Sequence, residues 1–182
     1  LTTTAAKVTA KTLSGSGTVA VTALDATLAA DLSNVGSTTV TAAFSNDGTF
    51  TGDLGTAVTT VATGVTMTAA ANVVAGKTVD KAGTGALAVQ VGNADAAVDL
   101  TTIAGTAFAS VTVTADVTFT GTLDDTVATS INNGVTLTTT AAKVTAKTLS
   151  GSGTVAVTAL DATLAADLSN VGSTTVTAAF SN

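Results

Sequence analysis

The chain has 182 residues, of which 46% are hydrophobic, and its six Lys and twelve Asp give a formal net charge of −6. It contains no Cys, His, Trp, Tyr, Pro, Arg or Glu. These absences exclude thiolate and imidazole metal sites and leave only Asp and Lys for acid–base catalysis. The acidic balance argues against nucleic acid as a partner, because affinity for phosphates depends on clustered Lys and Arg.

Short segments in which apolar residues alternate with Thr and other small residues recur along the whole chain. Alternation with a period of two indicates half-buried β-strands. No apolar run approaches the roughly 18 residues of a membrane-spanning helix, so we expect no membrane span. Strands are predicted, in chain order, around residues 19–21, 31–32, 40–44, 50–54, 57–61, 65–67, 77–79, 87–91, 98–100, 111–113, 119–123, 127–131, 135–137, 147–149 and 155–157.

The sequence repeats itself at two levels. Residues 137–182 are an unchanged copy of residues 1–46, which sets a period of 136 residues. Weaker similarity, such as Gly-Val-Thr at 64–66 and 134–136, defines half-repeats over 64–133 and from 134 onward through 182. We therefore predict one continuous array over residues 1–182 without separate domains, with 1–136 as a full period and 137–182 as the start of a second. An unchanged copy indicates a recent or homogenised tandem array, so we expect a longer array than this stretch.

The spacing of the strands predicts the fold class. Segments of 20–26 residues, six to a period, each combine an alternating strand, a bend containing Gly, Asn or Asp, and a second short strand. Such periods are typical of solenoids. We predict an all-β parallel β-solenoid (β-helix) with one segment per coil. The alternative is a row of small immunoglobulin-like β-sandwiches, because a half-repeat of 66–70 residues holds about seven short strands.

Two stretches resemble a known class of protein: GVTLTTTAAKVTAKTLSGSGTVAVT at 134–158 and TFTGDLGTAVTTV at 49–61. They are similar to the β-strand-repeat regions of giant bacterial secreted surface proteins. That class includes repetitive adhesins, S-layer-like proteins and extracellular filament proteins. The resemblance implies an extracellular, cell-surface location, a repetitive β fold and a structural or adhesive role, and it brings no catalytic residue.

Outward-facing Thr residues form the first candidate site. If Val65 and Met67 point inward, their neighbours point outward, because side chains alternate across a strand. We interpret the result as a structural ladder of hydroxyl groups, since cross-strand Thr pairs stabilise sheets; a flat array that binds ice or a polysaccharide is the alternative. The predicted ladder consists of Thr66, Thr68, Thr112, Thr114, Thr136 and Thr138.

Four Asp residues are the candidates for a Ca²⁺ site: Asp47, Asp95, Asp124 and Asp125. Calcium takes six to eight oxygen ligands, and none of the four lies in the Gly-rich nonapeptide of calcium-binding repeats. We therefore expect Asp side chains in turns, which they favour through local hydrogen bonds, and no cofactor. Adjacent Asp124 and Asp125 have no acid–base partner nearby in the sequence, so we expect no catalytic residue and no enzyme.

Lys residues occur in three pairs at a spacing of four: Lys7 and Lys11, 77 and 81, 143 and 147. We expect them on the surface, where charge blunts strand edges against unwanted pairing. The alternative is a Lys–Asp contact between neighbouring molecules that fixes lateral packing.

Together these features predict a structural extracellular repeat protein. We expect a long fibre, filament or surface-layer stalk that grows end to end by self-association, because an open strand edge templates another strand. The alternative is an adhesin shaft that binds a cell surface or a glycan.

Overall fold

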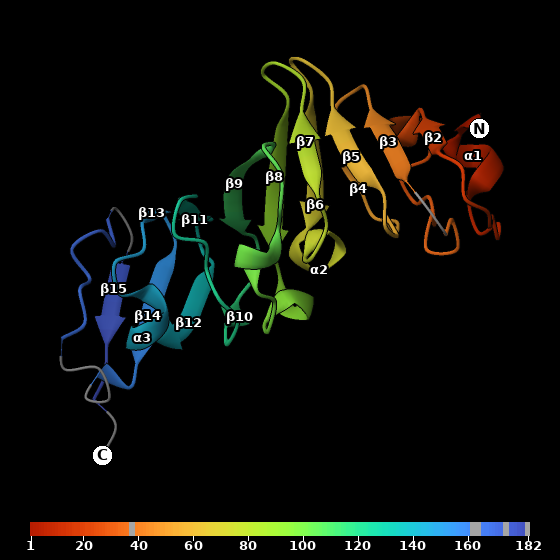
Figure 1. The fold of residues 1–182 in the computed structure, drawn as a ribbon. Helices are drawn as coiled ribbons and strands as arrows, with labels where there is room; N and C mark the ends of the chain where they lie inside the picture. Colours follow the sequence, from red (N-terminus) through yellow and green to blue (C-terminus); the bar gives the residue numbers. More distant parts are fainter. Residues whose placement is uncertain (37–38, 161–164, 173–174, 181–182) are drawn as a thin grey trace. The chain divides into compact units, whose positions relative to one another are not determined.

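The computed structural model describes residues 1–36, 39–160, 165–172 and 175–180 of the chain (Figure 1). The chain divides into two compact units. The first contains Leu1–Ala88 and Thr102–Ala109, and the second contains Val89–Thr101 and Ser110–Asn182. The two copies of the repeated sequence therefore lie in different units, 1–46 in the first and 137–182 in the second.

The first unit is built of short strands joined by turns and single helical turns. Its elements are, in chain order, β1 (Thr2–Thr4), α1 (Ala5–Val8), β2 (Val19–Thr22), η1 (Leu24–Ala26), β3 (Val40–Phe44), β4 (Gly48–Phe50), β5 (Val58–Val61), β6 (Thr66–Ala70), α2 (Ala71–Val74) and β7 (Val79–Lys81). Five of the strands form a parallel sheet in the order β1-β2-β3-β5-β7. Each inner strand thus pairs with strands of the segments before and after it, as Ala20 does with Thr2 and Thr41.

The second unit uses the same kinds of element. They are, in chain order, η2 (Asn93–Asp95), β10 (Val117–Thr118), β11 (Thr129–Ile131), β12 (Thr136–Thr140), α3 (Ala141–Val144), β13 (Leu149–Gly151), β14 (Thr154–Thr158) and β15 (Thr175–Ala178). Four strands form a parallel sheet in the order β10-β12-β14-β15. Strands β11 and β13, which lie between these in the chain, stay out of that sheet and pair in parallel with each other.

The division between the units falls within three elements: β8 (Ala86–Val91), η3 (Leu100–Thr102) and β9 (Phe108–Val113). The third sheet has six strands in the order β13-β11-β9-β8-β6-β4. Within the first unit β4 pairs with β6, where Thr49 faces Thr68, and within the second β9 pairs with β11, where Thr112 faces Ser130. Both of these pairings are parallel, as are those of the other two sheets.

The core consists of small and medium apolar side chains from alternate strand positions. In β6, Met67 and Ala69 are buried while Thr66 is exposed, and in β3 Val40, Ala42 and Phe44 are all buried. This alternation confirms the predicted inward and outward faces. Parallel strands covered on their inner face suit Val, Leu and Ala, whose branched or small side chains pack well on a pleated surface.

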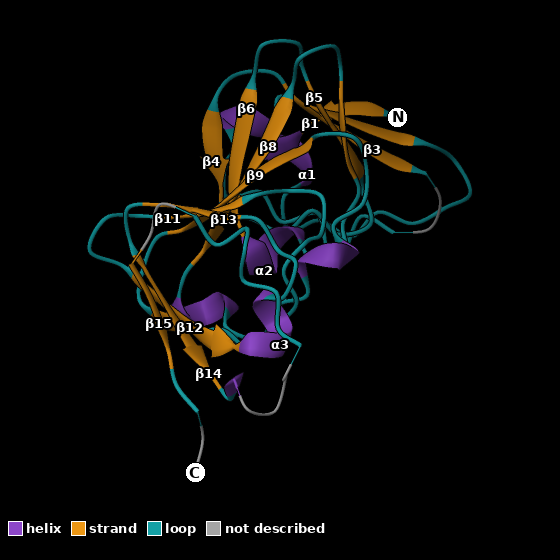
Figure 2. Cartoon of the chain, turned by 90° about the vertical axis from the view of Figure 1, so that its left-hand side faces the viewer, coloured by secondary structure: helices purple, strands orange, loops and turns teal. Residues whose placement is uncertain are grey.

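Single helical turns interrupt the strands at three equivalent places, α1, α2 and α3, and Figure 2 shows them as short coils between strands. Their sequences are AAKV, ANVV and AAKV, and each buries its first residue and its last. Ala71 and Val74, three residues apart, lie on one face of the turn because neighbours at that spacing share a helix face. Burial of this Ala–Val pair fixes the turn although it is far too short to be stable by propensity alone.

The predicted fold class is wrong. Among the described residues the strands form three separate small parallel sheets, helical turns alternate with them in an α/β-like arrangement, and no closed solenoid is formed. Parallel pairing also excludes the alternative of immunoglobulin-like sandwiches, which are antiparallel. The physical reason for the error lies in segments such as residues 66–74, where a β pattern runs directly into an Ala-rich helical turn without a break in composition.

Candidate functional site: the open strand edges

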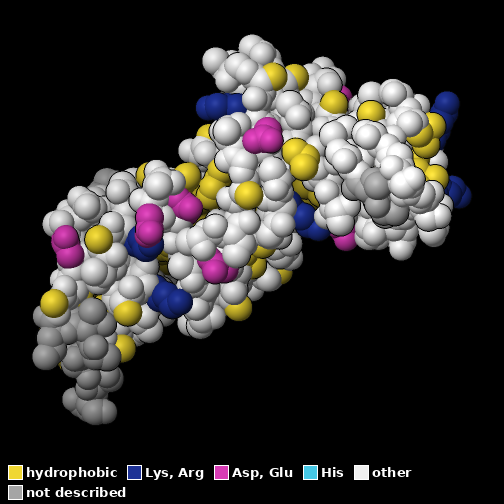
Figure 3. All heavy atoms as spheres, in the orientation of Figure 1, with side chains coloured by type: hydrophobic (Ala, Val, Ile, Leu, Met, Phe, Trp, Pro, Cys, Tyr) yellow, Lys and Arg dark blue, Asp and Glu magenta, His cyan; other side chains and the backbone are white. Residues whose placement is uncertain are grey.

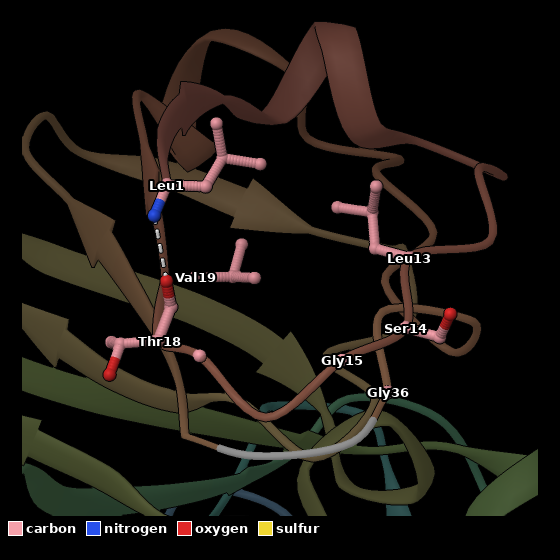
Figure 4. A pocket seen from close by; sticks show the side chains of 8 residues that line it. Leu1, Leu13, Ser14, Gly15, Thr18, Val19 and Gly36 are labelled. Atoms are coloured by element: carbon pink, nitrogen blue, oxygen red, sulfur yellow. Dashed lines mark hydrogen bonds between the residues drawn. The ribbon is translucent and has the colours of Figure 1, made fainter.

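The first edge of the molecule is β1, an end strand of the five-stranded sheet. Leu1, just before it, is 69% exposed, and its main-chain nitrogen donates a hydrogen bond of 2.8 Å to the carbonyl oxygen of Thr18 (Figure 4). Beside it lies a cavity of about 190 Å³, which we call the N-terminal pocket. It is lined by Leu1, Leu13, Ser14, Gly15, Gly17, Thr18, Val19 and Gly36.

The second edge is β15, an end strand of the four-stranded sheet. Val176 in this strand is 40% exposed, and Phe180, two residues after the strand ends, is 69% exposed. Large apolar side chains are thus presented to solvent at both edges.

Each of two exposed side chains, Leu1 and Phe180, has an identical counterpart that is buried elsewhere in the molecule. Leu137, the counterpart of Leu1, is fully buried in β12, whose outer side is paired with β10. Phe44, the counterpart of Phe180, is fully buried in β3, whose outer side is paired with β5. The same sequence therefore changes from open to covered according to whether further segments of the repeat flank it.

Two Lys side chains join successive segments in the same way. Lys77 donates from Nζ to the carbonyl oxygen of Gly55 at 2.7 Å and to the Asp53 carboxylate at 3.3 Å. Lys147 donates to the carbonyl oxygen of Leu123 at 3.1 Å and pairs with Asp125. We expected Lys side chains on the surface, away from other groups of the chain. These two instead bind the turn of the preceding segment.

The remaining candidate Asp residues bind backbone N–H groups. The Asp47 carboxylate accepts from the N–H of Thr66 at 2.7 Å, and the buried Asp95 accepts from the N–H of Gly92 at 2.8 Å. Asp124 accepts from the hydroxyl and the N–H of Thr126. The contacts of Asp95 and Asp124 are local, whereas that of Asp47 joins two successive segments, since Asp47 and Thr66 are 19 residues apart. In the described part of the chain, no group of three or more carboxylates is placed to hold a metal ion.

Hydrogen bonding sets the charge state of two partly covered carboxyls. Burial alone would raise the pKa of Asp124, but hydrogen bonds from Thr126 and the N–H of Val127, together with the charge of Lys147, lower it. Burial would likewise raise the pKa of Asp25, and hydrogen bonds from Asn46 and Ser45 lower it. Both carboxyls are therefore held in the ionised form that accepts these bonds.

The predicted Thr ladder is divided among strands. Thr66 and Thr68 lie in β6, Thr112 lies in β9 with Thr114 just after it, and Thr136 and Thr138 lie in β12 of another sheet. In the neighbouring strand β14, Thr154 lies beside Thr136 and Ala156 lies beside Thr138. The side chains of β6 and β12 meet other Thr residues one strand away, at Thr49 and Thr118.

Charged side chains do not gather into one patch on the face shown in Figure 3, where Lys and Asp appear as separate spots. Among the described residues no helix is long and apolar enough to span a membrane. No protein-family model matches the sequence, and neither the curated proteins nor the solved structures contain a match. The site must therefore be interpreted from its own geometry.

The sequence reasoning missed the N-terminal pocket. The alternation predicts a strand at Val19, but nothing in the composition of this stretch marks a cavity beside it. The pocket can be located by comparing the exposure of each residue in 1–46 with that of its identical counterpart in 137–182.

Proposed function

We propose that the protein is a structural repeat protein that builds a long extracellular fibre, filament or surface-layer stalk, in which copies of the 136-residue repeat follow one another end to end. The single observation that carries the proposal is the changed burial of identical residues. Leu1 and Phe180 are each 69% exposed at the open edges, whereas Leu137 and Phe44 are fully buried where further segments flank them.

Association at the edges follows from elementary energetics. An open edge presents backbone N–H and C=O groups that can pair with another strand. Burying a side chain as large as Leu or Phe contributes roughly 1.5–3 kcal/mol. Both terms are realised between successive segments in each unit, where β2 pairs with β1 and β3 and β14 pairs with β12 and β15, and where Val21 and Val155 are buried. The extracellular location rests on the resemblance to bacterial surface proteins.

The proposal is tested by following assembly of the purified chain with sedimentation velocity and electron microscopy over a concentration series. We expect species of increasing length as the concentration rises. The double variant Leu1→Lys/Phe180→Lys is expected to stay monomeric, because Lys on an edge opposes strand pairing. Both side chains are exposed in the single chain, so the fold of the variant is expected to be intact.

The matched control adds the same two positive charges elsewhere. Leu28 and Val58 are also exposed, at 36% and 37%, and neither lies in an end strand. Leu28→Lys/Val58→Lys is expected to assemble as the parent chain does. Equal loss of assembly in both variants would indicate a general charge effect. A parent chain that remains monomeric at every concentration, with immunogold labelling that finds the protein inside the producing cells, would overturn the proposal.

A further inference from the structure

A groove of about 420 Å³ lies in the second unit, where β10 pairs with β12. We call it the polar groove, and its volume is within the range of binding sites for small molecules. It is lined by Asn93, Asp116, Val117, Thr118, Thr136 and Thr138. Val117 is buried, and each of the other five side chains ends in a group that forms hydrogen bonds. The groove therefore offers a ligand polar groups and little apolar surface.

The register of the two strands brings the three hydroxyl groups together. Thr118 of β10 and Thr138 of β12 are direct partners, so their Cα atoms lie about 5 Å apart. Thr136 lies two residues before Thr138 in β12, and side chains at this spacing share one face of a strand. Leu137, between them, is fully buried, so both Thr side chains point away from the core. The three hydroxyl groups thus lie on one face of the sheet.

Asp116 and Asn93 add a carboxylate and an amide to the hydroxyl groups. Oδ1 of Asp116 accepts a hydrogen bond of 2.7 Å from the N–H of Thr136, which fixes the carboxylate beside the start of β12. Among the described residues, the second carboxylate oxygen, the Asn93 amide and the three hydroxyl groups have no hydrogen-bond partner. These groups are therefore free to exchange bound water for a ligand.

The first unit repeats the carboxylate and the three hydroxyl groups. Oδ1 of Asp47 accepts a hydrogen bond of 2.7 Å from the N–H of Thr66, and Thr49 of β4 is the partner of Thr68 in β6. The counterparts of these four residues in the second unit are, in the same order, Asp116, Thr136, Thr118 and Thr138. The arrangement is thus common to both half-repeats.

The amide distinguishes the two arrangements. Asp25 lies three residues before Leu28, and Asn93 lies three residues before Ala96. The carbonyl oxygens of Leu28 and Ala96 accept equivalent pairs of hydrogen bonds, from the N–H groups of Thr51 and Gly52 and from those of Thr120 and Gly121. Asp25 therefore takes the place of Asn93 in the first unit.

The first unit uses this position for a contact within the chain. Asp25 accepts hydrogen bonds of 2.9 Å from the N–H of Ser45 and of 2.6 Å from the amide of Asn46. In the second unit the counterpart of Asn46 is Ala115, which has no amide, and the amide of Asn93 is left for a ligand. We therefore expect tighter binding in the second unit than in the first.

The polar groups of the groove determine which ligands suit it. No Lys lines the groove, so an anion would meet the Asp116 carboxylate without a compensating positive charge. One carboxylate is also few for a divalent cation such as Ca²⁺, whose protein sites are built largely from carboxylates. Hydroxyl groups both donate and accept hydrogen bonds. A neutral ligand with many hydroxyl groups therefore matches the donors and the acceptors of the groove together.

We propose that the polar groove binds a neutral glycan chain, with Asp116 accepting a hydrogen bond from one sugar hydroxyl and the Asn93 amide donating to another. The inference goes beyond the proposed function and does not depend on it, because the groove is complete within one chain. Binding by a single groove is expected to be weak, since each hydrogen bond to the ligand replaces one to water. In an array of the proposed kind the groove recurs with every period, which raises the affinity for a long glycan.

NMR titration of the isotope-labelled chain with neutral hexasaccharides of glucose, mannose and galactose tests the site. We expect saturable shifts of the Asn93 side-chain signals and of the backbone signals of Thr118 and Thr138 with at least one of the three sugars. Asn93→Ala and Thr118→Val are each expected to weaken binding about threefold to tenfold, because each removes a hydrogen-bonding group. Both side chains are exposed and have no partner among the described residues, so the melting temperature is expected to stay unchanged.

The matched control is Thr49→Val, which removes the counterpart of the Thr118 hydroxyl from the first unit. It is expected to leave the affinity of the polar groove unchanged. Equal weakening by Thr49→Val and Thr118→Val would indicate contact with exposed Thr residues in general and would overturn the groove as a site. Absence of saturable shifts with all three sugars would overturn it as well. Shifts of the same signals by calcium chloride at lower concentrations than by any sugar would assign the groove to cations and contradict a neutral ligand.

Discussion

At the residue scale, four Ala residues adopt the left-handed backbone conformation, which lowers the stability of the folded chain. Ala10, Ala23, Ala146 and Ala159 all have positive φ, between 51° and 59°. A non-glycine residue in this region costs roughly 1–2 kcal/mol, because its Cβ approaches the following carbonyl oxygen. At the position two residues after the second helical turn the chain has Gly76 instead, at φ 69°. The diverged half-repeat thus uses the residue that this backbone conformation prefers.

We predict that Ala146→Gly raises the free energy of unfolding by about 0.5–1 kcal/mol, which is the relief of strain less the extra entropy of glycine in the unfolded chain. The reciprocal change Gly76→Ala is expected to lower it by about 1 kcal/mol. Gly76 has open space around its Cβ position, so the loss reports backbone conformation alone. The free energies of unfolding of the two variants are measured by urea denaturation, with circular dichroism as the readout. A loss of stability in Ala146→Gly would contradict the assignment of strain.

The two copies of one lysine provide a second test at this scale. Lys147 is mostly covered and binds Leu123 and Asp125, whereas Lys11 is exposed at the first edge. Lys147→Met is expected to lower the free energy of unfolding by about 1–2 kcal/mol, because a covered carbonyl loses a charge-assisted hydrogen bond. Lys11→Met is expected to change it by less than about 0.5 kcal/mol. Equal effects in chemical denaturation of the monomer would contradict the structural difference between the copies.

The lowered pKa values of Asp25 and Asp124 predict how stability depends on pH. Each folded-state pKa lies below the unfolded value, so the stabilisation is present above the unfolded pKa and is lost as the pH falls through the folded pKa. The melting temperature is therefore expected to fall as the pH is lowered through the acid range in which Asp carboxyls titrate. Asp124→Asn is expected to be less stable than the parent at neutral pH and to show a shallower fall in acid. An unchanged slope would contradict the role of Asp124.

Strands and helical turns differ sharply in how far the sequence predicts them. β3, β5, β8, β9 and β14 fall where alternation of Val, Ala or Phe places them. The three helical turns escape prediction because four residues are too few to show a period of 3.6, and their Ala-rich sequences continue the composition of the strand before them. The predicted strands at 98–100 and 119–123 are instead irregular stretches joined by a single bridge between Asp99 and Thr122, and a 3₁₀ turn begins at Leu100. Alternation alone therefore overestimates strand content in such short segments.

Gly153, which lies against the side chain of Ile131, gives a prediction at the element scale. Gly153→Ala puts a methyl group against Ile131 and the backbone of the turn that follows β11, and backbone cannot yield as a flexible side chain would. We expect it to lower the free energy of unfolding by about 1–3 kcal/mol, the usual cost of overpacking. Gly92→Ala is the control and is expected to be neutral, because a Cβ at Gly92 would lie 3.8 Å from Oδ2 of Asp95, an ordinary contact distance. Thermal melts of the two variants at low protein concentration compare them, and similar melting temperatures would show that β11 does not pack as the structure describes.

At the scale of the whole molecule, the repeat explains which parts of the site are predictable. The unchanged copy at 137–182 is visible in the sequence, and it identifies Leu1 and Phe180 as counterparts of Leu137 and Phe44. Sequence alone does not tell that β12 is covered by β10 or that β3 is covered by β5, because strand order depends on tertiary pairing. It also does not predict the division of the Thr ladder among sheets, since a register shift of two residues leaves the alternation unchanged. The end strands of the sheets are therefore identified from the structure, by comparing the burial of identical residues in the two copies.

The last prediction concerns continuation of the repeat at the second edge. A chain lengthened after Asn182 by residues 47–136 would place the counterpart of β5 next to β15, as β5 lies next to β3 in the first unit. Phe180 is expected to become as buried as Phe44. The parent sequence contains no Trp, so Phe180→Trp gives a single reporter in both lengths of chain.

In the parent length, the reporter is expected to show the red-shifted emission and strong acrylamide quenching of an exposed indole. In the lengthened chain, emission is expected to shift to the blue and quenching to fall, because the ring enters an apolar environment as Phe44 does. Phe44→Trp in the parent length supplies the buried reference. The comparison is made at a concentration where both chains are monomeric by sedimentation, so that burial between molecules does not contribute. If Trp at 180 remains as exposed in the long chain as in the short one, the added segments do not cover the second edge, and end-to-end continuation of the repeat by strand pairing is contradicted at that edge.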